Sequence, residues 1–290
     1  LACNSLIIRS VDFFHTPFSP KSIELVTQVL QSGRLSEGEM VKKFEEELSA
    51  SLGLSNPVAV NSGTSALHCA LALANIGSGD EVILSSQTFV ATGLVILIQG
   101  ATPVFADIQL GTGNIDPESV RNKITSRTRA IIAVHWGGEP CDMDELQQIA
   151  DERGIPIIED AAQAIGAKYK GKYIGDISDF TIFSFQAIKQ ITTGDGGMVI
   201  CNNSDLYKKG QRIRWFGIDR SAKHDGTWDN DICEIGYKYQ MTDIGASIGL
   251  EGLKEFKNIL NHRKKLFEVY LNELSKNKNI ICVNDDDKRK

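Results

Sequence analysis

The chain has 290 residues, of which 42% are hydrophobic and 23% are charged, as in an ordinary water-soluble globular protein. This length suits one large or two modest domains, and the composition excludes a mainly disordered, collagen-like or coiled-coil chain. The formal charge of −6 argues against a general nucleic-acid-binding protein, which would need a basic face.

The sequence shows neither a membrane-spanning run nor a secretory signal peptide. Its longest apolar run, at 93–98, is far shorter than the roughly 20 residues that span a bilayer. No basic start followed by an apolar core, as in a secretory signal, opens the chain. The six cysteines lack the spacings of metal or disulfide motifs. We therefore expect reduced thiols, no metal ion, no membrane partner and a cytoplasmic location.

Helical and extended patterns alternate along the chain. Apolar residues at 41, 44, 48 and 52 have helical spacing and predict a helix over 41–52. In chain order, the other predicted elements are an extended run at 57–60, a helix at 66–75, a strand at 81–84, a helix at 89–98, strands at 102–105 and 130–134, a helix at 142–153, strands at 155–158, 180–185 and 198–201, and helices at 244–256 and 260–274.

This alternation predicts an α/β fold, with a mainly parallel sheet flanked by helices on both faces. Ligands of such open sheets bind at the carboxyl ends of the strands, so functional residues should directly follow the apolar runs. We expect an N-terminal segment at 1–20, a large ligand-binding domain at 21–254, and the start of a small, truncated C-terminal domain at 255–290.

The first polar motif, at 61–66 (NSGTSA), joins an extended run to a helix. Gly63 lets the backbone approach a ligand closely, and Thr64 and Ser65 offer hydroxyls. Together with the free amides of a helix start they would form an anion site. Taken alone, the motif is better explained as an ordinary N-cap, where Ser and Thr are preferred.

The second motif is the pair Glu159 and Asp160, which ends a buried strand. Because side chains alternate between the two faces of a strand, we expect only one of these carboxylates to face a ligand. A turn or N-cap acid before Ala161 explains the pair equally well.

The third motif is Lys189, which follows a strand and precedes the glycine-rich stretch 192–197. Burial in apolar surroundings lowers the pKa of a lysine and keeps its amine nucleophilic, as a Schiff-base lysine requires. For a single lysine, a place on a flexible surface turn is the more common explanation.

The order of the three motifs indicates more than each motif alone. A phosphate cradle, then a strand-end acid, then a lysine after a later strand is the layout needed to hold pyridoxal phosphate (PLP). The cradle would bind the phosphate, the acid would keep the pyridine nitrogen protonated, and the lysine would hold the aldehyde.

With these motifs in this order, the chain resembles the PLP-dependent sugar aminotransferases of the DegT/StrS type, which have the aspartate-aminotransferase fold. The resemblance extends from about Thr16 to Leu274. It rests on six segments: NSGTSALH (61–68), GDEVILSSQTFVAT (79–92), HWGGEPCDMDEL (135–146), EDAAQAIGA (159–167), SFQAIKQITTGDGGM (184–198) and YQMTDIGASIG (239–249).

The resemblance implies roles for the matching residues around the cofactor. Lys189 would hold the cofactor as a Schiff base and move the proton, Asp160 would pair with the pyridine nitrogen, and Gln163 would lie near the ring hydroxyl. The phosphate would be held by Gly63, Thr64 and Ser184. Phe89 would stack on the ring.

Three further residues are expected in or near the site. His135 would lie near the cofactor or substrate, although a satisfied core histidine is a strong alternative. Arg220, in the basic stretch 212–220, could receive a substrate diphosphate, but a solvated helix end is the more common explanation. Lys238 stands where the family commonly has an Asn that reaches the cofactor phosphate of the partner subunit.

The implied function is transfer of an amino group, with glutamate as donor, to a nucleotide-linked keto-deoxy sugar. The implied assembly is a homodimer with shared active sites. Family members are longer than this chain, so we expect part of the substrate site to be missing from it. Dehydration of a similar sugar is one alternative, although that branch has His in place of Lys189. A non-catalytic regulator and a nicotinamide enzyme are the others, and no GxGxxG motif supports the last.

Overall fold

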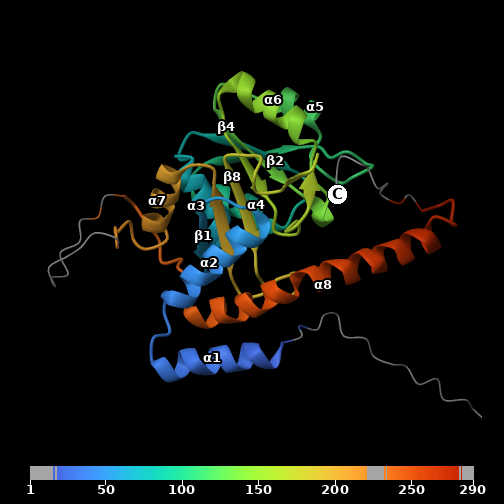
Figure 1. Cartoon of the computed structure of the whole chain (residues 1–290). Helices are drawn as coiled ribbons and strands as arrows, with labels where there is room; N and C mark the ends of the chain where they lie inside the picture. Colours follow the sequence, from blue (N-terminus) through green and yellow to red (C-terminus); the bar gives the residue numbers. More distant parts are fainter. Residues whose placement is uncertain (1–15, 17, 221–231, 233, 281, 283–290) are drawn as a thin grey trace, which may run out of the picture.

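The computed structural model describes residues 16, 18–220, 232, 234–280 and 282 (Figure 1). Most of the predicted segment 1–20 and the last residues of 255–290 lie outside the described residues. Within them, one large sheet has the strand order β1-β9-β8-β5-β4-β2-β3. Its strands are β1 (Pro57–Val60), β2 (Glu81–Ser85), β3 (Thr102–Ala106), β4 (Thr128–Val134), β5 (Ile157–Asp160), β8 (Phe180–Ser184) and β9 (Gly197–Cys201).

The sheet is mainly parallel, as the alternating pattern predicts. Strands β3, β2, β4, β5 and β8 pair in parallel, whereas β9 pairs antiparallel with both β8 and β1. A separate small hairpin consists of β6 (Lys168–Tyr169) and β7 (Lys172–Tyr173). Because β1 runs in the same direction as the parallel strands, their carboxyl ends meet at one edge of the sheet.

Helices cover both faces of this sheet (Figure 1). Successive strand residues such as Ile157 and Ile158 belong to different hydrophobic clusters, because side chains alternate across a strand. One face packs against α2 (Glu39–Leu52), α5 (Pro117–Lys123), α6 (Met143–Arg153) and α8 (Asp243–Leu274). The other face packs against α3 (Gly63–Leu73), α4 (Val90–Ile98) and α7 (Ser204–Ile213). Helix α1 (Pro20–Ser32) lies along α8 (Figure 1).

In the C-terminal region, the prediction of two separate helices at 244–256 and 260–274 is wrong. The structure has one continuous helix, α8, of 32 residues. The intervening residues 257–259 contain neither Gly nor Pro, and Phe256 and Leu260 both pack on Gly166, so the helical periodicity is unbroken. The predicted domain boundary at 254/255 therefore falls inside α8, and the division into two domains stays a prediction.

Among the described residues, no helix combines the length and the apolar character needed to cross a membrane.

A buried ionic cluster joins α7 to α2 and β1. Arg214, which is 4% exposed, donates through Nη1 to Glu45 at 2.6 Å and to the carbonyl of Ala59 at 3.0 Å. Its Nη2 donates to Glu37 at 2.8 Å. Burial raises the pKa of Glu45, and the positive charge of Arg214 opposes that rise. Within the basic stretch 212–220, Arg214 is thus a structural cation.

We expect Arg214→Ala to lower the free energy of unfolding by about 3–5 kcal/mol, because it leaves the buried carboxylate of Glu45 without its cation. Urea titration followed by circular dichroism measures the loss. Arg121→Ala is the matched control: Arg121 pairs with Glu152 at the surface, and such a pair contributes about 0–1 kcal/mol. A loss at Arg214 no larger than that of the control would show that the cluster is not needed for stability.

Candidate active site

A cavity of about 440 Å³ lies at the carboxyl ends of the parallel strands, on the face that α3 and α4 cover. Most residues predicted for the site line it: Gly63, Thr64, Phe89, His135, Asp160, Gln163, Ser184 and Lys189. Arg220 and Lys238 do not line it. The topology therefore brings together side chains that are more than 100 residues apart in the sequence.

The anion cradle is the start of α3. Ser62 caps this helix: its hydroxyl accepts from the Ser65 amide at 3.0 Å, and its carbonyl accepts from the Ala66 amide. The amides of Gly63 and Thr64 precede these capped groups and point out of the helix start, where amides have no intrahelical acceptor. A Cβ atom at Gly63 would lie 2.9 Å from the Cβ of Ser184, so only glycine allows α3 to approach β8 this closely.

The two strand-end carboxylates face opposite sides of the sheet. Asp160 lines the cavity, and its Oδ2 accepts a hydrogen bond from the Thr92 hydroxyl at 2.8 Å. Glu159 is fully buried on the other side, where Oε2 lies 2.9 Å from Nε2 of His135 and Oε1 accepts from the Thr181 hydroxyl. Burial raises the pKa of Asp160, and the hydrogen bond from Thr92 is the largest opposing effect.

His135 reaches the cavity but has both ring nitrogens engaged within the protein. Nδ1 accepts from the amide of Cys141 at 3.1 Å, so Nε2 carries the proton that is donated to Glu159. The side chain is 0% exposed. These bonds match the satisfied core histidine, and they leave neither nitrogen for a hydrogen bond to a substrate.

Gln163 is oriented by a tight turn after β4. The amide of Gly137 donates to Oε1 of Gln163 at 2.8 Å, which directs the Nε2 donor group elsewhere. Gly137 has φ 65°, a conformation that favours glycine. The side chain of Gln163 therefore offers a donor, rather than an acceptor, to a group in the cavity.

Lys189 follows β8 and lines the same cavity. Burial lowers the pKa of its amine, and the negative charge of Asp160 opposes that effect. Phe89, at the N-cap position of α4, is 70% exposed and also lines the cavity. An anion cradle, a carboxylate, a nucleophilic amine and an aromatic ring thus share one cavity, which is the set of groups that PLP requires.

Comparison with known proteins gives the same result. A sequence model of the DegT/DnrJ/EryC1/StrS aminotransferase family matches residues 18–290. The chain belongs to this family. Among its relatives, GDP-perosamine synthase of Escherichia coli O157:H7 is 36% identical over 264 residues, which are 91% of this chain and 71% of that protein.

Solved structures of the family superpose closely on this chain. The sugar aminotransferase CalS13 of Micromonospora echinospora gives a TM-score of 0.92 at 33% identity, covering 97% of this chain and 78% of that one. The PLP-form of Spr1654 from Streptococcus pneumoniae gives 0.86 at 33% identity, covering 92% and 72%. The predicted fold, enzyme class and PLP cofactor are thereby confirmed.

Two of the predicted site residues lie outside the cavity of their own chain. Nζ of Lys238 is 3.3 Å from the centre of the Trp215 ring, and the guanidinium of Arg220 is 5.2 Å from the same ring. Arg220 also lies 3.3 Å from Glu37. The structure thus places Arg220 in a surface ion pair beside Trp215, and not among the groups that line the cavity.

Thr88 and Thr92 line the cavity and were not predicted as site residues. Both belong to the segment 79–92 that supports the family resemblance, and their spacing of four residues across a helix start is the sequence signal that they share a face. The contact of Thr92 with Asp160 joins residues 68 positions apart, which a sequence pattern does not reveal.

Proposed function

We propose that this family member transfers an amino group from glutamate to the keto carbon of a nucleotide-linked keto-deoxy sugar. The observation that carries the proposal is the meeting of Lys189, Asp160 and the α3 cradle in one cavity. The similarity to a GDP-perosamine synthase supports a nucleotide sugar as acceptor.

The residues of the cavity would hold the cofactor at both ends. The amides of Gly63 and Thr64 and the hydroxyl of Ser184 bind its phosphate at the positive end of the α3 dipole. Nε2 of Gln163 would donate to the ring hydroxyl, because its Oε1 is already engaged by the Gly137 amide. Phe89 would give the ring apolar contact.

When bound, PLP supplies an electron sink for the bond that is broken at the amino-bearing carbon. Asp160 holds a proton on the ring nitrogen through its carboxylate. Nζ of Lys189 is the amine that would hold the cofactor's aldehyde, and it would carry the proton between the two reacting carbons. Burial lowers the pKa of Lys189, so the neutral amine that can accept this proton is present at a lower pH than for an exposed lysine.

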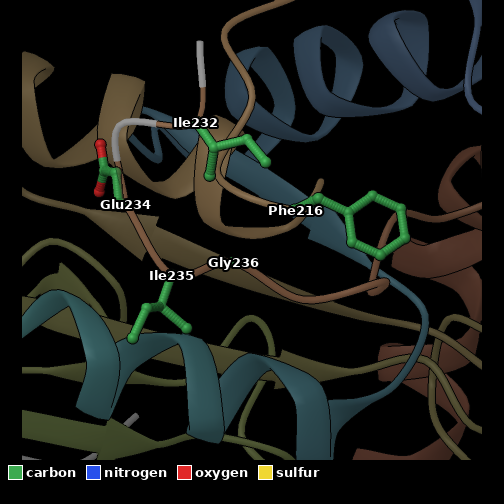
Figure 2. A pocket seen from close by; sticks show the side chains of 5 residues that line it. All are labelled: Phe216, Ile232, Glu234, Ile235 and Gly236. Carbon is green, nitrogen blue, oxygen red and sulfur yellow. The ribbon is translucent and has the colours of Figure 1, made fainter. Parts of the chain in front are cut away.

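We further propose that two copies of the chain form a homodimer with shared active sites. Large apolar side chains of α4 are exposed: Val90, Leu94, Leu97 and Ile98. A second apolar feature is an open hollow in which Phe216 and Ile232 lie on one side of segment 234–236 and Ile235 lies on the other (Figure 2). Tyr237 donates to Gln99 at 3.3 Å and so joins this hollow to the end of α4. Such an apolar surface supports a protein partner.

In this dimer, Lys238 would reach the cofactor phosphate of the neighbouring subunit. The usual Asn would bind the ionised phosphate through a neutral amide, whereas the ammonium of Lys238 would add a full positive charge to the bond. The competing state is the one in the structure, where Nζ lies over Trp215 in a cation–π contact, of the kind that contributes about 0.5–2 kcal/mol.

We expect Lys238→Ala to weaken PLP retention by about tenfold, the loss of one charge-assisted bond, and Lys238→Asn to restore much of it. Equilibrium dialysis of each variant against PLP measures retention. The Lys238→Ala variant is also mixed with the Lys189→Ala variant, which has no Schiff-base lysine. The activity of this mixture should change, because each site draws on both chains. If Lys238→Ala retains PLP as tightly as the parent, the contact has no role in cofactor binding.

The overall proposal is tested by mixing the purified protein with PLP and glutamate and recording the cofactor absorbance. Glutamate alone should convert the cofactor to its amino form, and a keto-sugar nucleotide should convert it back. A panel that varies the nucleotide and the position of the keto group identifies the acceptor. Conversion by glutamate with no acceptor in the panel would contradict the nucleotide-sugar assignment, and no conversion by glutamate would contradict the donor.

A further inference from the structure

Three side chains form a hydrogen-bonded series that ends at Asp160. The Thr92 hydroxyl donates to Oδ2 of Asp160 at 2.8 Å, and the hydroxyls of Thr88 and Thr92 are 2.8 Å apart. Thr92 is 0% exposed and Asp160 is 6% exposed, so water does not replace these bonds easily. The other carboxylate oxygen, Oδ1, accepts from the amide of Ala162 at 3.2 Å.

The chemistry of the groups sets the direction of this series. An ionised carboxylate only accepts hydrogen bonds, and a hydroxyl has one proton to donate. Thr92 therefore gives its proton to Asp160, and Thr88 must donate to Thr92. Each oxygen of Asp160 thus has one protein donor and keeps one acceptor position for another group.

The hydrogen bonds that Asp160 accepts matter because its carboxylate and a ring nitrogen paired with it compete for one proton. Burial makes the carboxylate more basic, and the Thr92 hydroxyl is the strongest of the effects that make it less basic. A less basic carboxylate leaves the proton on the ring, where it supports the electron sink. Without Thr92, the buried acid would compete more strongly for the proton, and the Ala162 amide would be its remaining protein donor among the bonds described above.

We propose that Thr92, oriented by Thr88, is a positioning residue that keeps the Asp160 carboxylate ionised and fixed toward the cavity, so that the shared proton stays on the cofactor's ring nitrogen. The inference rests on the proposed role of Asp160 and adds to it a hydroxyl pair from the start of α4.

The test uses the protein loaded with PLP that is labelled with ¹⁵N in the ring, and it reads the nitrogen chemical shift by NMR. The parent should show a protonated ring nitrogen. Thr92→Val removes the hydroxyl at constant shape; it should move the signal toward the unprotonated position and weaken PLP affinity by about tenfold. Thr92→Ser should restore both, and Thr88→Val should move the signal less, in the same direction.

Thr181→Val is the matched control, because it removes the same kind of hydroxyl bond, at 2.9 Å, from the neighbouring carboxylate of Glu159 on the opposite face. It should leave the nitrogen shift unchanged even if its melting temperature falls. If Thr92→Val does not fold, Thr92→Ala takes its place with the same expected shift.

The outcomes separate this inference from the proposed function. An unchanged shift and affinity in Thr92→Val, with a changed shift in Asp160→Asn, would overturn the role of Thr92 and leave that of Asp160 intact. An unchanged shift in Asp160→Asn would overturn the role of Asp160, and with it the inference.

Discussion

Lys189→Ala should abolish aminotransferase turnover while the fold survives. We expect a loss of about 10⁴-fold or more, since the variant lacks both the covalent hold on the cofactor and a proton carrier, and proton transfer alone contributes about 10²–10⁴-fold. Lys189 lines the cavity and is only half-buried, so its truncation should leave the melting temperature nearly unchanged. Steady-state rates and thermal denaturation of the same preparation measure the two effects.

Borohydride reduction of the loaded parent protein should fix the cofactor to the peptide that contains Lys189. Lys172→Ala is the control, because Lys172 is an exposed lysine of the nearby hairpin, and it should retain full activity and full labelling. A reduced adduct on Lys168, Lys170 or Lys172 would contradict the assignment.

The pKa of Lys189 also predicts how the rate of loading the protein with cofactor depends on pH. Burial, aided by the charge of Arg263 and opposed by Asp160, lowers the pKa of Lys189. A lowered pKa means that the nucleophilic free amine is present at a lower pH than for an ordinary lysine, whose pKa is about 10.4. The rate of covalent PLP attachment to the cofactor-free protein should therefore rise with pH, through an inflection below that value.

Asp160→Asn should keep the covalent attachment of PLP but slow the glutamate half-reaction by about 10²-fold or more. The amide cannot hold a positive ring nitrogen by charge, and removal of one preorganised electrostatic partner costs about 10²–10³-fold in other enzymes. Stopped-flow absorbance measures the rate, and borohydride labelling of Lys189 confirms that the cofactor is still attached.

Glu159→Gln provides the comparison on the other face of β5. Because Glu159 binds His135 and Thr181 away from the cavity, this variant should lose stability while a folded preparation retains the rate. A normal rate in Asp160→Asn together with a slow rate in Glu159→Gln would transfer the role to Glu159.

The sequence by itself determined the fold class and the central groups of the site. Periodicity is local, so β-branched runs and helical spacing predict strands and helices within a few residues. Once the sheet is mainly parallel, residues that follow its strands must meet at one edge. This is why Gly63, Asp160 and Lys189 could be placed together before any contact between them was known.

Only the tertiary structure decided what depends on packing between distant segments. Strand alternation predicts that Glu159 and Asp160 face opposite sides, but which side holds the cavity depends on where α3 and α4 pack. The hydroxyl of Thr92 meets Asp160 only because the start of α4 crosses the end of β5. These contacts join segments far apart in the chain, and their geometry is set by the packed core rather than by any local pattern.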